Sequence, residues 1–526
     1  MEKRTIIALI LTAVIIFIFQ IYFTPQQPQK SPIPPAKQID KSVQEDKPKT
    51  DIQTKKPLPA KKKEPIQLTP PKDIKIETPL FYITMVDFGA GIKSVKLKKY
   101  KETVKDNKPK EIIEDIKPYT YIPRLTIPTP EGSIEDNVNF KYDKEGLIIN
   151  NKPETITFTG TLLNGSRVKK SYTFYPDRYT FDLKIEIEGA DSNKAYIDFA
   201  IIEEKKKSSY NFKGPFVYNG KKFEQIENIE KNMEIGKTYK YTGLDEGYFA
   251  FILIPKDDAA PAMILKNDNI PVIRIFPEKN VISTSLFFGP KQTDVLKSLN
   301  VNAEKIIDFG WFDVIAKPLV WGMNFSNRLT HNYGIDIILL TILIKIIFYP
   351  LSLKSYKSMK EMQKLQPQIQ KLREKYKDDK QKLNQEMMEL YRRRKINPMG
   401  GCLPMLIQIP VFFALYKALS GAIELRHAHF LWWINDLSAP EDLFSFTVLG
   451  FTIPIRLLPL IMGITQVIQQ KMTPTSADPM QEKMMLFMPI LFTFLFWGFP
   501  SGLVLYWLVN NVISIGQQYY INKKVS

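Results

Sequence analysis

Long runs of apolar residues divide the chain into two kinds of sequence. One run, from Ile6 to Phe23, follows Lys3 and Arg4, and five more lie after residue 330. A helix needs about 20 mostly apolar residues to cross the hydrocarbon core of a bilayer. The pattern therefore predicts six membrane-spanning helices, at residues 6–23, 335–353, 403–425, 454–470, 484–499 and 501–521.

The apolar period shortens to two between residues 74 and 298. Asn164-Gly165 separates two alternating runs there, which is typical of a hairpin turn. A third run alternates apolar and polar positions as a strand with one buried face does, and its apolar members are Tyr179, Phe181, Leu183, Ile185 and Ile187. Further runs reach about Phe288, so we predict an antiparallel β-sandwich at 74–298.

No catalytic or metal-binding pattern is visible in this predicted sandwich. It contains no histidine, and its carboxylates fall among the polar positions of the strands. We interpret them as solvated surface groups. Sugar binding stays open as an alternative, because sandwiches of this size often bind glycans.

Two connecting segments have patterns of their own. Thr24-Pro25-Gln26-Gln27 offers no small-residue cleavage site, so residues 1–23 are interpreted as an uncleaved anchor. Residues 24–73 are rich in proline and lysine, which predicts an extended linker. Within 299–332 apolar residues recur at near-helical spacing, which predicts an amphipathic helix on the outer membrane surface, and they are Phe312, Ile315, Leu319, Met323 and Phe325.

Charge gives the predicted spans an orientation. The chain has 73 Lys+Arg against 55 Asp+Glu, and residues 354–396, between the second and third spans, are strongly basic. Basic loops stay in the cytoplasm. Six spans then place both termini in the cytoplasm and the sandwich outside. The run Arg392-Arg393-Arg394-Lys395 fits either a topology signal that faces lipid or a docking surface for an RNA-rich partner, and both can hold.

The basic loop also has an apolar seam. Residues spaced three and four apart form two short runs, interrupted at Asp378-Asp379, which predicts a helical hairpin of the coiled-coil type. Pro367 is expected to kink its first arm. The seam residues are Met362, Leu365, Ile369, Leu372, Tyr376, Leu383, Met387 and Leu390.

Polar residues inside the predicted spans gather in their cytoplasmic half, and no Asp or Glu lies well inside a span. This distribution predicts a wet groove that opens to the cytoplasm and closes toward the outside. A charge within a span is a functional candidate, although Lys345 can also snorkel to the interface; Lys417 is its counterpart near the outer side. The candidate groove residues are Lys345, Thr341, Gln408, Ile409, Tyr506, Trp507, Asn510, Asn511 and Gln517.

Several chemical functions find no support in the sequence. No glycine-rich phosphate loop occurs, and the single cysteine, Cys402, excludes an intramolecular disulfide. Ser501 beside Gly502 has no histidine within a span to activate it. The three histidines, His331, His427 and His429, are interpreted as loop residues rather than metal ligands. We therefore predict neither an enzyme nor a cofactor, and a secondary transporter remains the alternative among membrane proteins.

Short motifs along nearly the whole chain give it a resemblance to a known family. The chain resembles the YidC membrane protein insertases of Gram-negative-type bacteria at Phe288-Gly289-Pro290-Lys291, Asp308-Phe309-Gly310-Trp311, Tyr349-Pro350-Leu351, Leu365-Gln366-Pro367, Asp378-Asp379-Lys380-Gln381, Asn397-Pro398-Met399-Gly400-Gly401-Cys402, Gln408-Ile409-Pro410, Asp436-Leu437-Ser438 and the stretch from Phe499 to Trp507.

The resemblance implies a polytopic α-helical protein of the bacterial inner membrane with a periplasmic all-β supersandwich, a five-helix insertase core at 333–526 and a cytoplasmic helical hairpin at 354–396. The resemblance implies that the partners are nascent membrane proteins, the bilayer, the Sec translocon and the ribosome. It also implies that the protein acts as a monomer and does not read a nucleic acid sequence. Two positions depart from the family. Lys345 stands where an arginine is usual, which loses the bidentate fork, and Trp507 stands where a second tyrosine is frequent.

Overall fold

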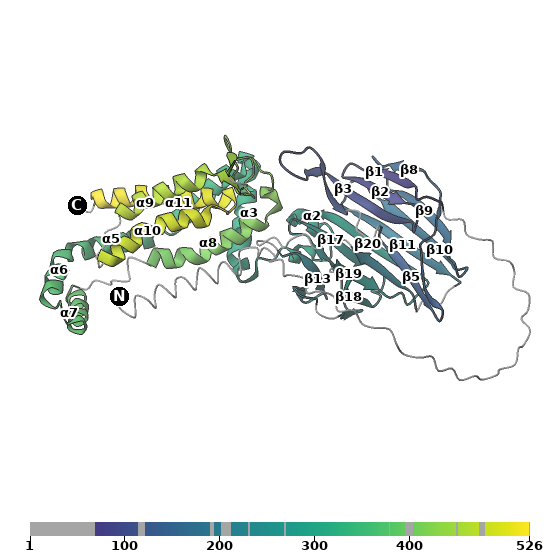
Figure 1. The fold of residues 1–526 in the computed structure, drawn as a ribbon, viewed down its shortest axis with the longest axis horizontal. Coiled ribbons are helices and arrows are strands. Elements are labelled where there is room, and N and C mark those ends of the chain that lie inside the picture. The colour runs from purple at the N-terminus through teal and green to yellow at the C-terminus, as the bar shows by residue number, and fades with distance from the viewer. Residues whose placement is uncertain are drawn as a thin grey trace, which may run out of the picture.

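The computed structural model describes residues 69–113, 121–189, 194–200, 212–229, 232–267, 270–377, 379–394, 403–448, 451–472 and 479–524. The predicted N-terminal anchor and most of the predicted linker lie outside these described residues. Figure 1 shows a β-rich part and a helical part, with helices α6 and α7 at the end of the helical part that is far from the strands.

The β-rich part contains three sheets. The five-stranded sheet has the order β4 (Pro109–Ile113), β3 (Gly91–Lys101), β2 (Phe81–Val86), β1 (Asp73–Glu77) and β8 (Gly146–Ile148). The nine-stranded sheet has the order β14 (Phe223–Gln225), β13 (Gly214–Tyr218), β16 (Tyr241–Asp245), β17 (Phe249–Pro255), β20 (Val281–Pro290), β11 (Thr180–Glu188), β10 (Arg167–Phe174), β9 (Glu154–Thr161) and β7 (Lys141–Tyr142). The six-stranded sheet has the order β15 (Met233–Gly236), β18 (Ala262–Asn267), β19 (Ile270–Ile275), β12 (Tyr196–Ala200), β5 (Arg124–Thr129) and β6 (Gly132–Glu135).

The predicted alternation in β11 is confirmed, because Phe181, Leu183, Ile185 and Ile187 are at most 1% exposed. The predicted hairpin is confirmed as well. It joins β9 to β10, and Gly165 has the positive φ of 87° that glycine tolerates. One pairing departs from the predicted antiparallel pattern, since β1 runs parallel to β8.

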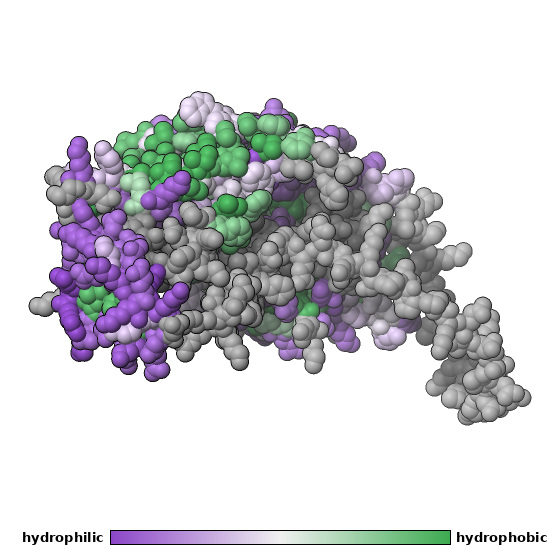
Figure 2. Space-filling view, turned by 60° about the vertical axis from the view of Figure 1, so that its left-hand side comes forward, coloured by the Kyte–Doolittle hydropathy of each residue, from purple (hydrophilic) through white to green (hydrophobic). Residues whose placement is uncertain are grey.

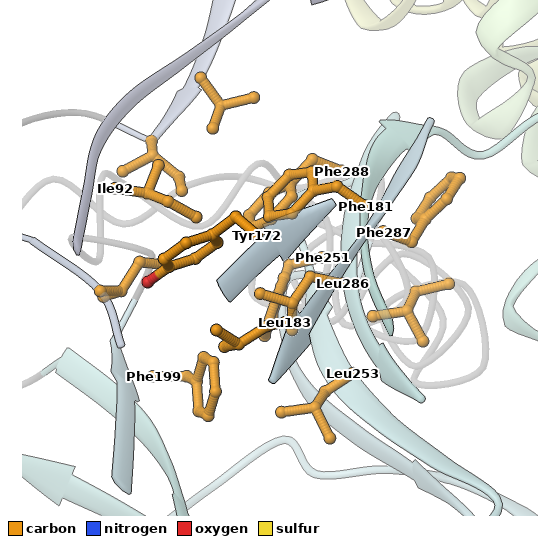
Figure 3. Close-up of a cluster of buried hydrophobic side chains, with 14 of the residues drawn as sticks. Ile92, Tyr172, Phe181, Leu183, Phe199, Phe251, Leu253, Leu286, Phe287 and Phe288 are labelled. Atoms are coloured by element: carbon orange, nitrogen blue, oxygen red, sulfur yellow. The ribbon is translucent and has the colours of Figure 1, made fainter. Parts of the chain in front are cut away.

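Both smaller sheets pack on the nine-stranded sheet. The Tyr172 hydroxyl of β10 donates to the carbonyl oxygen of Ala90, beside the five-stranded sheet, over 2.7 Å. Phe199 of β12, in the six-stranded sheet, stacks on Phe251 of β17 with ring centroids 6.0 Å apart. Figure 3 shows these aromatic side chains gathered with aliphatic ones in one buried cluster.

The prediction that the carboxylates of the sandwich are solvated is wrong for Asp136 and Asp245, which are both 0% exposed. Asp136 Oδ2 lies 2.6 Å from Lys170 Nζ, and Asp245 Oδ2 lies 2.7 Å from Lys291 Nζ. Lys170 also donates to two backbone carbonyl oxygens, those of Gly89 and Pro123. It occupies an inward position of β10, and an ammonium on the apolar side of a strand requires a buried counter-charge.

Short helices α2 (Thr293–Lys297) and η2 (Ala303–Ile306) follow β20 and pack with the hydrophobic core of the sandwich. The helical part begins with η3 (Gly310–Phe312). Its remaining elements are α3 (Asp313–Thr330), α4 (Tyr333–Ile347), α5 (Tyr349–Lys364), α6 (Gln366–Lys375), α7 (Lys380–Arg393), α8 (Leu403–Gly421), η5 (Ile423–Leu425), β21 (Phe444–Val448), β22 (Phe451–Ile455), α9 (Leu457–Met472), α10 (Pro479–Phe496) and α11 (Ser501–Lys524).

The predicted second span is not one straight helix. It breaks at Phe348 into α4 and α5, which are bent by 63°. Pro350 lies in the first turn of α5, and a proline there lacks the N–H that would continue the bonding of α4. Within the described ranges, no helix by itself has the length and apolar composition of a membrane span, whereas α4 and α5 taken together do.

Prolines also shape the segment predicted as a hairpin. Pro367 does not kink a continuous arm. Instead α5 ends at Lys364 and α6 begins at Gln366, with Pro367 in its first turn, where a missing N–H costs nothing.

Figure 2 shows hydrophilic side chains gathered at one end of the helical part and a broad band of hydrophobic side chains along its surface.

Helix α3 is apolar on two sides. Ala316 and Met323 are buried against neighbouring helices, and α3 packs on both α4 and α8. Trp321 is 70% exposed and Phe325 is 55% exposed. The predicted apolar stripe is therefore divided between the inside of the helical part and its surface.

Candidate functional site

Four of the predicted groove residues belong to one hydrogen-bonded network, which we call the polar network: Lys345, Gln408, Tyr506, Asn510 and, in addition, Ser514. Lys345 Nζ donates to Ser514 Oγ over 2.6 Å, and Ser514 Oγ donates to the Asn510 carbonyl oxygen over 2.7 Å. Gln408 Nε2 donates to Asn510 Oδ1 over 2.6 Å and lies 2.9 Å from the Tyr506 hydroxyl. The polar network thus connects α4, α8 and α11.

Helix α11 supplies three members of the polar network because of their spacing. Tyr506, Asn510 and Ser514 follow one another at intervals of four, and side chains at this interval lie on one face of a helix. This face meets α4, which carries Lys345, and α8, which carries Gln408. Ser514 was not among the predicted residues, although this interval could have identified it.

Lys345 lies at the boundary between buried and exposed residues of α4. Its side chain is half-buried, while Ile344 before it is buried and Ile346 after it is 64% exposed. An ammonium in this position reaches the polar network on one side and adjoins an apolar surface on the other. A charge at such a boundary can meet a polar segment that arrives beside an apolar one.

The carboxylate of Asp336 fixes the start of α4. It is 0% exposed and accepts hydrogen bonds from Ser326 Oγ, Asn327 Nδ2 and Thr330 Oγ1 of α3, over 2.6, 2.7 and 2.7 Å. Asp336 was not among the predicted residues, because it lies at the end of a predicted span. Ser326, Asn327 and Thr330 lie close together in the sequence, and these three donors could have indicated a buried carboxylate nearby.

Three other predicted groove residues have different surroundings. The Thr341 hydroxyl is buried and donates to the Ile337 carbonyl oxygen within α4. Asn511 Nδ2 lies 3.4 Å from Thr465 Oγ1 of α9. Gln517 is half-buried, and its Oε1 has no hydrogen-bond partner among the described residues.

The remaining two predicted residues differ in accessibility. Trp507 belongs to an aromatic cluster, with its ring 5.0 Å from that of Phe412 and 5.1 Å from that of Phe496. Ile409 is 46% exposed on α8, directly after Gln408. Ile409 is therefore the accessible apolar position next to the polar network, whereas Trp507 joins α8, α10 and α11.

The predicted seam of the basic segment is more enclosed than its surroundings. Ile369 is 1% exposed and Leu365 is 5% exposed, whereas Met388, outside the seam, is 61% exposed. The half-buried seam residues are Met362, Leu372, Tyr376, Leu383, Met387 and Leu390. Helices α6 and α7 pack on each other.

The β-rich part contacts the loop that follows α8. Arg426 donates to the Glu102 carbonyl oxygen over 2.9 Å, and its guanidinium lies 5.3 Å from the centre of the Phe249 ring. Ile423 is 3% exposed and packs with the hydrophobic cluster of the sandwich. Burial and the neighbouring Arg426 lower the pKa of His427, so this histidine is neutral at pH 7 and Arg426 carries the charge of the contact.

Comparison with known proteins covers both parts of the chain. The family model described as "YidC periplasmic domain" matches residues 73–322, and the one described as "60Kd inner membrane protein" matches residues 325–526. A protein of Syntrophus aciditrophicus named "Membrane protein insertase YidC" is 39% identical, with 100% of each chain covered. One of the same name from Geobacter sulfurreducens is 38% identical over 100% of this chain and 99% of that protein.

A solved structure described as an active YidC insertase with its first transmembrane domain resolved has 20% sequence identity and a TM-score of 0.40, and the match covers 87% of this chain and 95% of that one. The two family models and the full-length relatives agree on one assignment. This chain belongs to the YidC family of membrane protein insertases, a family of bacterial inner-membrane proteins.

Proposed function

We propose that this insertase moves polar segments of nascent membrane proteins out of the cytoplasm through a hydrated groove along the polar network, alone or together with the Sec translocon. The observation that carries the proposal is the polar network itself, in which Lys345 of α4 is joined through Ser514 and Asn510 to Gln408 of α8. Lys345 and Gln408 are half-buried at the edge of this network, whereas Tyr506, Asn510 and Ser514 are buried. Polar groups at the edge of an apolar surface suit a substrate that is polar at one end and apolar at the other.

The free energy needed to move a charged residue into the bilayer is comparable to the contributions that can offset it. A charged residue at the centre of a bilayer costs roughly 3 kcal/mol on insertion scales. An ammonium about 4 Å from a substrate carboxylate offsets about 4 kcal/mol at an effective dielectric constant near 20. The membrane potential adds about 2.3 kcal/mol per 100 mV for each negative charge that moves outward. The attraction to the ammonium and the membrane potential together offset the cost of moving an acidic tail. Our proposal therefore requires no nucleotide, cofactor or covalent step.

The orientation that we propose has six spans, both termini in the cytoplasm, the sandwich in the periplasm and the α6–α7 hairpin in the cytoplasm. The basic residues of 354–396 support it through the positive-inside rule. The separation of the hairpin and the sandwich at opposite ends of the helical part agrees with it (Figure 1). In this orientation the hairpin is the first part of the chain that a nascent protein or a ribosome meets.

The substrate's own apolar helix leaves along the surface of the third and fifth spans, which correspond to α8 and α10. Their exposed apolar side chains, Ile409 at 46%, Phe487 at 59% and Phe494 at 73%, support this path. Transfer of the substrate helix from this surface into lipid is favourable because its apolar side chains leave water. Lys345 acts on the polar tail and the apolar surface acts on the helix.

Site-specific photocrosslinking tests this proposal. A photoreactive residue at Ile409 should form adducts with a nascent single-span protein during translation into membranes. The matched control is Ile464 of α9, which is equally apolar and 61% exposed but lies outside the proposed path. Equal adduct yields from Ile409 and Ile464 would contradict a defined path.

A further inference from the structure

The loop between α8 and α9 contains a two-stranded hairpin whose two faces differ. Directly opposed residues of an antiparallel pair lie on the same face of the sheet. The register sets Phe444 opposite Ile455, and Phe446, two residues after Phe444, lies on the same face. Ser445, Thr447 and Pro454 lie on the other face. The hairpin is therefore amphipathic across its thickness.

Two phenylalanines of the apolar face are not covered by the parts of the chain that the structure describes. Phe444 is 56% exposed, Phe446 is 42% exposed and the adjoining Leu443 is 40% exposed. None of the three belongs to a hydrophobic cluster of the described residues. An exposed apolar surface of this kind marks an interaction site.

The base of the hairpin is fixed at the start of a helix. Glu441, just before β21, accepts the Leu458 backbone N–H at the first turn of α9 and the Trp433 indole N–H over 2.8 Å. Arg456, just after β22, donates to the Glu441 carbonyl oxygen. The hairpin consequently emerges at the same level as the first turn of α9, a predicted span.

We propose that the β21–β22 hairpin lies flat in the outer headgroup region of the inner membrane, with its apolar face toward the acyl chains. Lipid is the occupant that fits, because no charged residue occurs from Leu443 to Ile455 and because the hairpin adjoins the end of a span. The edges of a two-stranded sheet have unpaired backbone groups, which cannot enter hydrocarbon. The hairpin therefore rests at the interface and does not cross it.

Two exposed tryptophans outside the hairpin agree with this placement at the membrane interface. Trp432, in the same loop, is 80% exposed, and Trp321 of α3 is 70% exposed. Tryptophan is enriched at membrane–water interfaces because its ring is apolar at one side and donates a hydrogen bond at the other. The hairpin, Trp432 and the exposed side of α3 form an outer belt that sets the height of the helical part in the bilayer.

A depth-sensitive fluorescent probe tests this placement in the full-length chain. Because Cys402 is the sole cysteine, a Cys402→Ser background allows an NBD label at a single introduced cysteine. Phe446→Cys samples the apolar face and Thr447→Cys, the next residue, samples the polar face. Tyr82→Cys, on β2 and 45% exposed, is the aqueous reference. Each labelled protein is reconstituted in phosphatidylethanolamine–phosphatidylglycerol liposomes with or without nitroxide-labelled lipids.

The probe at Phe446 should emit at shorter wavelength and be quenched by lipid nitroxides several-fold more strongly than the probes at Thr447 and Tyr82. Aqueous iodide should quench the three in the reverse order. A probe at Phe446 that behaves like the one at Tyr82 places the face in water and overturns the proposal. Protection from both quenchers means that a second copy of the chain covers the face, which also overturns it. Phe444→Cys repeats the measurement on the same face, and unchanged circular dichroism identifies the folded variants.

Discussion

The sandwich and the helical part place their polar and apolar groups in opposite ways. In the sandwich, Phe181, Phe251 and Phe288 are at most 1% exposed, and the Asp136–Lys170 pair is fully buried. In the helical part, Ile346 is 64% exposed and Phe494 is 73% exposed. The sandwich thus hides its large apolar side chains from water, whereas the helical part buries some of them and presents others to its surroundings. The reversal is what a change of solvent from water to lipid requires.

The two parts also differ in how a lysine ammonium is compensated, and Lys170 and Lys345 are the examples. Lys170 has three hydrogen-bond acceptors within 3.0 Å and no exposed surface, so its charge is compensated within the fold. Lys345 is half-buried and donates to the hydroxyl of Ser514, which is not a counter-charge. An ammonium without a carboxylate partner in its own network retains its attraction for a visiting anion. The two lysines should respond in different ways to the same replacement.

The largest effect is expected for Asp136→Ala. Removal of one partner of a buried ion pair costs about 3–5 kcal/mol, because the other charge stays buried. We expect this loss in the free energy of unfolding of the sandwich, measured by pulse proteolysis of the full-length protein in urea. Insertion should change little. The double variant Asp136→Leu with Lys170→Met should recover most of the stability, since an apolar pair of similar volume replaces the charges.

The exposed pair of Asp73 with Lys93 is the control, because its side chains are 45% and 38% exposed. Asp73→Ala should cost at most about 1 kcal/mol. Equal losses for Asp73→Ala and Asp136→Ala would show that burial of the pair does not matter.

The second effect concerns Lys345 and should appear in insertion rather than in stability. Lys345→Arg keeps the charge and should be neutral or better. Lys345→Ala should impair substrates with acidic tails by up to about 4 kcal/mol, the Coulomb energy at about 4 Å and a dielectric constant near 20. Lys345→Glu should be worst, by repulsion. The measurement is protease protection of paired substrates that differ only in tail acidity.

Lys417→Ala on α8 is the matched control, since Lys417 is also half-buried but belongs to the outer half of its predicted span. Substrates with uncharged tails should be affected least by any change at Lys345, because Gln408 and Asn510 still offer hydrogen bonds. Equal loss for both tails, or from Lys417→Ala, would mean that Lys345 has a snorkelling or structural role.

Local patterns predicted the elements well where a single segment decides them. The alternation of β11, the turn at Asn164-Gly165 and the start of α8 at Leu403 all follow from neighbouring residues. The break at Phe348 did not follow from hydropathy, because both sides of it are apolar. Pro350 was the signal, and its effect depends on the backbone rather than on polarity.

Contacts between distant segments were less accessible to sequence reasoning. Asp136 and Lys170 meet only because β10 faces the loop after β6, which an alternating pattern does not reveal. Within the polar network, the interval of four residues between Tyr506 and Asn510 was available in the sequence as a sign that they share one face of α11. It could not show that Trp507, one residue further, turns into an aromatic cluster with Phe412. Helix faces follow from the sequence, but their neighbours follow from packing.

The third effect is expected at Asp336, a buried carboxylate on the helical side. Asp336→Ala removes the acceptor of Asn327 and Thr330 of α3, whereas Ser326 still has the Met323 carbonyl oxygen; an unsatisfied buried group costs about 1–3 kcal/mol. We expect a lower thermal unfolding midpoint of the helical part. Asp336→Asn, which keeps the shape, should lose less. Asp442→Ala is the control, as that side chain is 48% exposed, and a comparable loss there would contradict the role of burial.

The fourth effect is expected in the α6–α7 hairpin. Ile369→Asp places a charge at a position that is 1% exposed and should loosen the packing of α6 on α7. Shortening 360–394 should act in the same direction, because both ends remain attached to the predicted spans. Insertion should fall several-fold, or about 1 kcal/mol, while the protein level holds. Met388→Asp, at a 61% exposed position, is the control; full insertion after the shortening would reduce the basic segment to a topology signal.

The smallest effect on insertion is expected from the largest change, deletion of residues 80–290. The sandwich lies at the other end of the helical part from α6 and α7 (Figure 1), and its two buried ion pairs are formed within its own fold. Deletion nevertheless uncovers Ile423, which is 3% exposed and packs with the sandwich. We therefore combine the deletion with Ile423→Ser, and keep α3 in place because Asp336 depends on it. Insertion by this variant should match that of the full chain at equal protein level. If the deletion with Ile423→Ser abolishes insertion, while Ile423→Ser alone does not, the sandwich takes part in the process and the two parts of the molecule are not independent.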